Sequence, residues 1–126
     1  MSSIDHARPQ ATTFRLTIRN LVVLHDAYAA ASAAILSVLN MPRCTGPVAD
    51  ILEDEVERMD KMREAAIAEL RRQEPTTLDD IDDRVKVLVA WEASGEDWPE
   101  VANLLGLAAI RRLSLSAANA PAAVAA

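Results

Sequence analysis

Aromatic residues, glycine and cysteine are all scarce in this chain, and each scarcity argues against a class of protein. Only four of the 126 residues are aromatic and three are glycine, whereas β-proteins rely on aromatic and β-branched residues and on glycine in their turns. The single cysteine, Cys44, excludes an internal disulfide and a zinc site built from cysteines. Alanine, leucine, glutamate and arginine are good helix formers. The composition therefore predicts an all-α fold.

No segment of the sequence has the pattern of a targeting signal or a membrane span. The first ten residues lack the apolar stretch of a signal peptide, and the longest uncharged run, residues 27–42, is shorter than the roughly 20 residues that cross a bilayer. A lone thiol suits a reducing compartment. We therefore expect a soluble, cytoplasmic protein.

The negative charge is concentrated in the middle of the chain. Residues 47–75 contain nine acidic and five basic side chains, and the whole chain has a net charge of −6. Nonspecific binding to nucleic acid or to an anionic membrane needs a basic surface instead. We expect no membrane partner, and we do not favour nucleic acid.

Hydrophobic residues recur at the three- and four-residue spacing of amphipathic helices in four segments. These segments are residues 13–40, residues 48–73, residues 77–94 and a last one that begins at Asp97. Thr77 and Asp97 are predicted N-caps, because each can accept a hydrogen bond from a backbone N–H of the first turn. Short connections between long helices favour antiparallel neighbours. We therefore predict an up-down bundle of about four helices.

The two ends of the chain are expected to lie outside this bundle. We predict a disordered arm over residues 1–11, a helical domain over residues 12–116 and a disordered alanine-rich tail over residues 117–126. Phe14, Leu16 and Ile18 alternate with polar residues in the manner of a strand. We expect a helix there nonetheless, because a single strand has nothing to pair with.

The first helix is apolar on two opposite sides. Leu21, Leu24 and Tyr28 belong to its main hydrophobic stripe, and a second face of small residues lies opposite. That second face consists of Val23, Ala27, Ala30 and Ala34. A helix that is apolar on both sides is usually buried on both sides. We expect these four residues to form an interface with another copy or a protein partner; the alternative is that this helix is the centre of its own bundle.

Acidic pairs in the middle of the chain resemble the magnesium ligands of all-α nucleotide pyrophosphohydrolases. The pairs are Asp54 with Glu57, Glu57 with Asp60, Asp79 with Asp82 and Asp80 with Asp83, each three residues apart. In a hairpin that turns near Pro75, the two sets would lie on the order of 15 Å apart, given a rise of 1.5 Å per residue. We therefore expect a solvated acidic face, with no metal and no cofactor.

No other arrangement of side chains marks a catalytic site. His25 lacks the acidic residue three positions earlier that a di-iron site needs, and there is no glycine-rich phosphate loop or serine nucleophile motif. Glu55 and Arg63 lie near the buried stripe of the second helix. We expect them to reach water along the edge of that stripe; the alternative is an ion pair, with Arg15 or Arg19 as the partner of Glu55.

The last segment resembles a degenerate helix-turn-helix over residues 98–113. Its hydrophobic pattern changes phase after Gly106, which is typical of two short helices joined by a turn. Arg111 and Arg112 would then lie on the recognition helix and contact DNA. The resemblance is incomplete, because Arg112 occupies a position where the motif has an apolar residue.

These observations favour a non-enzymatic helical interaction protein, such as a small regulator, adaptor or assembly factor, that self-associates as a homo-oligomer, with a dimer as the expected form. The first alternative is a DNA-binding regulator that uses the helix-turn-helix-like segment. The second is a magnesium-dependent nucleotide pyrophosphohydrolase.

Overall fold

The computed structural model describes residues 15–119 of the chain. Within this range it contains four helices and no strand. The helices are α2 (Ile18–Leu39), α3 (Gly46–Arg72), α4 (Leu78–Ser94) and α5 (Trp98–Ala118). The prediction of an all-α bundle of about four helices is confirmed.

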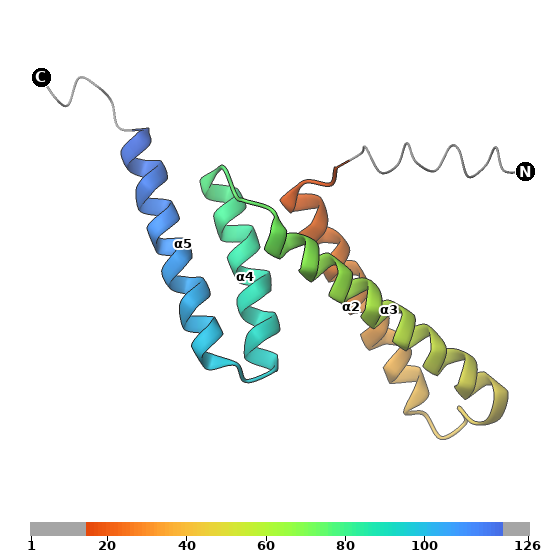
Figure 1. The fold of residues 1–126 in the computed structure, drawn as a ribbon. Helices are drawn as coiled ribbons and strands as arrows, with labels where there is room; N and C mark the ends of the chain where they lie inside the picture. The colour runs from red at the N-terminus through yellow and green to blue at the C-terminus, as the bar shows by residue number, and fades with distance from the viewer. Residues whose placement is uncertain (1–14, 120–126) are drawn as a thin grey trace, which may run out of the picture.

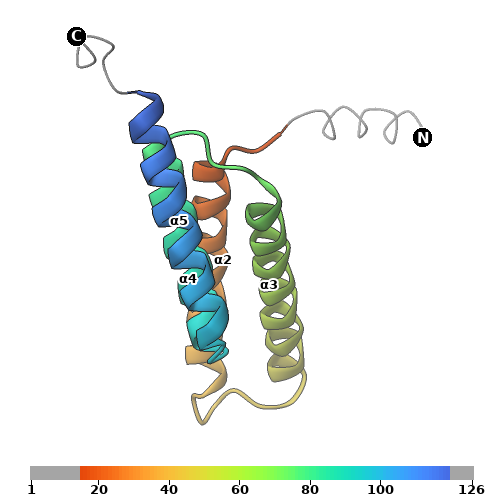
Figure 2. The same ribbon diagram turned by 60° about the vertical axis from the view of Figure 1, so that its left-hand side comes forward.

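The helices are arranged as two antiparallel hairpins, α2–α3 and α4–α5 (Figure 1). Helix α4 joins the hairpins, because it packs against α2 and, more lightly, against α3. Among the described residues, the backbone of α5 closely approaches α4 and no other helix. In the turned view of Figure 2, α5 lies in front of α4, and the turn between α2 and α3 lies at the bottom of the molecule.

The hydrophobic core lies where the two hairpins meet. Leu70 of α3 and Leu88 of α4 are completely buried, and Ile18 and Leu21 from α2 and Leu104 from α5 complete the cluster around them. These side chains come from the start of α2, the end of α3, the middle of α4 and the first half of α5. The part of the α2–α3 hairpin near its turn therefore lies outside this core.

Both predicted N-caps of the second hairpin are confirmed. The Thr77 hydroxyl accepts a hydrogen bond from the backbone N–H of Asp80 at 3.1 Å, and the Asp97 carboxylate accepts one from the N–H of Glu100 at 3.2 Å. Asp79 and Asp80 also place negative charge in the first turn of α4, where the helix dipole favours it.

The predicted start of the first helix is wrong. Residues 15–17 are not helical, and α2 begins at Ile18. Thr17 is its N-cap: its hydroxyl accepts from the N–H of Asn20 at 3.1 Å, and the Asn20 side chain accepts from the N–H of Thr17 at 3.5 Å. This capping box fixes the N-terminus of α2 at Thr17, so the helix does not extend back toward the predicted start. Before the cap, the carbonyl of Leu16 accepts a hydrogen bond from the Gln73 side chain at 2.8 Å.

Two other boundaries differ from the sequence prediction. Helix α3 begins at Gly46, two residues before the predicted start, because Pro47 suits the first turn of a helix; Gly46 has a φ of +66°, which a glycine adopts without strain. Helix α5 includes Ala117 and Ala118, although the sequence predicts a disordered tail from residue 117 onward. The predicted arm over residues 1–11 lies outside the described residues.

The Thr77 cap can be tested by substitution. We expect Thr77→Ala to lower the free energy of unfolding by about 1 kcal/mol, because an N–H at the start of α4 loses its acceptor. Urea denaturation monitored by circular dichroism measures this change. Thr76→Ala is the matched control, because Thr76 precedes the cap and makes no cap bond. An equal loss in both variants would contradict the assignment.

Candidate functional site

The helix-turn-helix prediction for residues 98–113 is wrong, because α5 continues through Gly106 without a turn. A side chain built at Gly106 would meet no atom within 4 Å, so this glycine lies on the open surface of the helix. The change of hydrophobic phase has another cause. Leu104 and Ala108 are buried against the bundle, whereas Leu105 and Leu113 point to solvent. Helix α5 is therefore apolar on its outer side as well.

The two arginines proposed to contact DNA are paired with carboxylates of the chain itself. A guanidinium nitrogen of Arg111 lies 2.6 Å from Glu74, in the connection between α3 and α4. Arg112 pairs with Asp82 of α4. Binding DNA phosphates would require both pairs to break.

A second set of ion pairs joins α3 to the α4–α5 hairpin. Arg71, near the end of α3, pairs with Glu92 of α4 and, at 3.4 Å, with Glu100 of α5. The Glu92 side chain is only 16% exposed, so its charge depends on this partner. Arg71 therefore connects three helices.

Arg84 of α4 also connects the two hairpins. We call the region formed by Leu70 and Arg71 of α3 and by Arg84 and Leu88 of α4 the joint. Its guanidinium donates hydrogen bonds to the carbonyl of Leu70 at 2.7 Å and to the carbonyl of Arg71 at 3.1 Å. These carbonyls belong to the last turn of α3, where no intrahelical donor is available. Burial lowers the pKa of Arg84, and the nearby positive charge of Arg111 adds to this effect.

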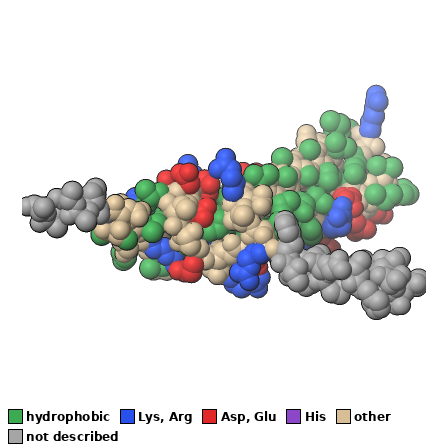
Figure 3. Space-filling model, turned by 90° about the horizontal axis from the view of Figure 1, so that it is seen from above, with side chains coloured by type: hydrophobic (Ala, Val, Ile, Leu, Met, Phe, Trp, Pro, Cys, Tyr) green, Lys and Arg blue, Asp and Glu red, His purple; other side chains and the backbone are tan. Residues whose placement is uncertain are grey.

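The four residues predicted to form an interface lie together on the outer face of α2. Val23, Ala27, Ala30 and Ala34 are all exposed, and Val23 is 59% exposed. The alternative, that α2 is the centre of its own bundle, does not describe this structure. Seen from above, hydrophobic side chains gather over the end of the molecule where the α2–α3 hairpin lies (Figure 3).

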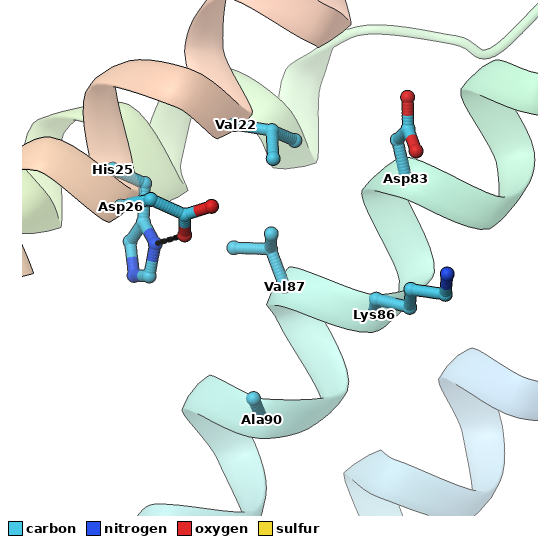
Figure 4. Close-up of a pocket in the computed structure, with 7 residues that line it drawn as sticks. All are labelled: Val22, His25, Asp26, Asp83, Lys86, Val87 and Ala90. Atoms are coloured by element: carbon cyan, nitrogen blue, oxygen red, sulfur yellow. Dashed lines mark hydrogen bonds and ion pairs between the residues drawn. The ribbon is translucent and has the colours of Figure 1, made fainter.

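A cleft of about 280 Å³ lies between α2 and α4. Val22, Val87 and Ala90 form its apolar part, and its polar residues are His25, Asp26, Asp83 and Lys86. The polar groups do not converge (Figure 4): His25 Nδ1 lies 3.1 Å from its neighbour Asp26, whereas Asp83 and Lys86 lie on the opposite wall. Asp83 also lies 3.8 Å from Arg19. His25 and Asp26 are within hydrogen-bond reach of each other, but Asp83 and Lys86 belong to the other wall, so the four polar groups do not converge on one reacting atom.

An aromatic and cationic stack lies beside this cleft. The ring of His25 meets the Trp91 ring edge-on, with the centroids 6.4 Å apart, and the Arg63 guanidinium lies 5.4 Å from the Trp91 ring centre. Arg63 also lies 3.7 Å from Asp60, which accepts a hydrogen bond from Ser32 at 3.0 Å. This stack links α2, α3 and α4.

Several members of the acidic pairs that resemble a magnesium site are engaged in separate ion pairs. Glu57 lies 3.8 Å from Lys61, and Asp82 and Asp83 pair with Arg112 and Arg19. Over residues 15–119, no group of three or more histidine, cysteine, aspartate or glutamate side chains is placed to hold a metal ion.

Glu55 pairs with neither of the arginines considered for it. Its carboxylate lies 3.0 Å from Arg58 on the exposed side of α3. The hydrogen bond from Arg58, together with the positive charge of that residue, lowers the pKa of Glu55.

Two helices, α2 and α5, are long and apolar enough to cross a membrane. This differs from the expectation based on uncharged runs, since a span tolerates a few charged residues. Core helices of soluble proteins and signal sequences have the same length and composition, so the property does not distinguish among them.

Sequence reasoning missed the outer face of α5. Trp98, Leu105, Ile110 and Leu113 are each more than half exposed. Glu100 and Arg111 fall on the other side of the helix, but Arg112, seven residues after Leu105, lies beside that leucine on the helix surface. The sequence alone therefore did not separate the charges of α5 from its apolar face, and the phase change was read as a turn.

Comparison of the chain with protein-family models, with curated proteins and with solved structures finds no match.

The three-helix contact of Arg71 leads to a prediction about stability. We expect Arg71→Ala to lower the free energy of unfolding by about 1–2 kcal/mol, because it leaves the largely buried Glu92 without its cation. Arg72→Ala is the control: Arg72 is 73% exposed and pairs with Glu69 on its own helix, so we expect a loss of a few tenths of a kcal/mol, roughly. Urea denaturation compares the two, and equal losses would show that Arg71 does not hold the joint.

Proposed function

We propose that this protein is a non-enzymatic helical protein–protein interaction module that associates with copies of itself. The observation that carries the proposal is the amount of hydrophobic surface left uncovered by the described helices. Thirteen large hydrophobic side chains are exposed, and twelve of them fall in two groups, on the α2–α3 hairpin and on α5. Contiguous apolar surfaces of this kind mark interaction sites.

The outer face of α2 is suited to a close contact with another helix. Its alanine side chains are short, so a second helix can approach the backbone of α2 closely. Val23 supplies a larger apolar contact at one end of this face. A single molecule gains no hydrophobic stabilisation from this face, whereas burial in an assembly stabilises by about 25 cal/mol for each Å² of apolar area.

The turn end of the α2–α3 hairpin extends the apolar surface. Leu36, Val38 and Met41 are exposed at the end of α2, and Val48 and Ile51 are exposed at the start of α3. Neither α4 nor α5 lies over this end of the hairpin (Figures 1 and 2). The same surface can receive a protein partner in a regulator, adaptor or assembly factor.

The arrangement of polar groups supports a role without catalysis. The three charged side chains of α5, and Asp83 of the cleft, are in ion pairs that join one part of the bundle to another. Such pairs position helices, whereas catalysis requires polar groups that converge on a reacting atom. We also propose a cytoplasmic location, on the basis of the single thiol of Cys44.

Sedimentation of the full chain across a range of concentrations tests self-association. We expect the mean mass to exceed that of a monomer as the concentration rises between about 1 and 200 µM, the range of ordinary micromolar dissociation constants. A mass that stays monomeric throughout would contradict the proposal.

Two substitutions test whether the outer face of α2 takes part. We expect Ala30→Glu to weaken the assembly at least about tenfold, because it places an unpaired charge in an apolar contact. Ala65→Glu adds the same charge to the exposed, charged side of α3 and should leave the mass unchanged. An oligomer that Ala30→Glu leaves intact would place the interface elsewhere.

A further inference from the structure

Helix α5 carries a continuous apolar stripe on the side that faces away from α4. Its residues recur every three or four positions and are all exposed: Trp98, Ala102, Leu105, Ala109 and Leu113, with Gly106, Ile110 and Ala117 beside them. We call this stripe the outer α5 face. Exposure reaches 59% at Trp98 and 70% at Leu113, and α5 forms the outer edge of the molecule in Figure 1.

The outer α5 face contains no charged residue, although the chain has a net charge of −6. Helix α5 has three charged side chains, and each pairs with a residue outside this helix: Glu100 with Arg71, Arg111 with Glu74 and Arg112 with Asp82. The solvent-exposed face of an amphipathic helix normally carries its charged residues. Here a second acidic copy can approach without placing like charges in the contact.

The face is also complementary to itself in an antiparallel arrangement. With a two-fold axis between the levels of residues 107 and 108, Trp98 meets Ala117 of the second copy and Ala102 meets Leu113. In the middle, Leu105 meets Ile110 and Gly106 meets Ala109. A parallel arrangement would place Trp98 against Trp98 and Leu113 against Leu113. Large side chains opposite small ones pack more densely, so the antiparallel pairing is favoured.

We propose that α5 is the docking site for α5 of a second copy of this chain, packed antiparallel about a two-fold axis near Gly106 and Ala109. This inference rests on the proposed self-association and adds a second contact to it, separate from the outer face of α2. Gly106 has open space where a side chain would be, which lets the two backbones approach closely at the axis.

The size of this contact sets the expected affinity. A helix of 21 residues is about 30 Å long, at 1.5 Å per residue. Two such helices bury on the order of 1,000 Å² in total, which lies at the lower end of specific interfaces. We therefore expect a dimer that dissociates in the micromolar range and that a single buried charge disrupts.

The first test is sedimentation of Leu113→Glu beside the wild-type chain. We expect the dissociation constant of the dimer to rise about 100-fold or more, because an unpaired carboxylate would be buried opposite Ala102 of the second copy. Ala65→Glu, which adds the same charge to an exposed position of α3, should leave it unchanged. Circular dichroism of each variant checks that the helices remain.

The second test determines the orientation of the helices by disulfide formation. Cys44→Ser removes the native thiol, and one batch of chain then carries Ala102→Cys while a tagged batch carries Leu113→Cys. In the antiparallel pair, positions 102 and 113 of different copies are adjacent, whereas two copies of position 102 lie about 16 Å apart along the axis. A disulfide needs Cα atoms within about 7 Å. We therefore expect mixed disulfides on combining the batches and none in either batch alone.

Each other outcome overturns a defined part of the argument. A wild-type chain that stays monomeric overturns both this inference and the proposed function. A wild-type dimer that Leu113→Glu leaves intact overturns the inference alone. Disulfides that form within either cysteine batch by itself also overturn the inference alone. A monomeric wild-type chain that binds phosphatidylcholine vesicles, and loses that binding in Leu113→Glu, assigns the outer α5 face to a lipid surface instead.

Discussion

The joint between the two hairpins is the contact on which the rest of this structure depends. Leu70 and Leu88 are completely buried there, and Arg84 of α4 binds the carbonyls that end α3. Arg71 adds the ion pairs that reach α4 and α5. Together with the stack of His25 and Arg63 on Trp91, these few side chains determine how α2 and α3 sit relative to α4 and α5.

Concentrating the core at this joint has a consequence for the surface. A chain of this size can bury a substantial core, but here the main core cluster lies where the two hairpins meet, and hydrophobic residues elsewhere on α2, α3 and α5 remain exposed. Helix α5 has one inner neighbour, α4, and thus one buried side. An amphipathic helix would present polar residues on its other side, whereas α5 presents leucine, isoleucine and tryptophan. The small core and the exposed apolar surface therefore both result from the meeting of the two hairpins at one junction.

Local signals predicted this fold better than long-range ones. Thr77 and Asp97 were identified as caps because capping depends on residues three positions apart, which the sequence places next to each other. The turn predicted at Gly106 failed because one glycine costs a helix only about 1 kcal/mol, and the packing of Leu104 and Ala108 on either side offsets that cost. The partners of Arg111 and Arg112 lie 37 and 30 residues away. The hydrophobic periodicity of a helix cannot predict ion pairs between residues so far apart in the sequence.

The same distinction explains which part of the candidate site could be predicted. The face formed by Val23, Ala27, Ala30 and Ala34 was found because helical spacing alone places these residues together, and they do lie together on α2. The outer α5 face could be recognised only once Arg111 and Arg112 were known to pair within the chain. Before that, two adjacent arginines indicated a surface for DNA. Their pairing with Glu74 and Asp82 changes what the helix presents to solvent, from a cationic surface to an apolar one.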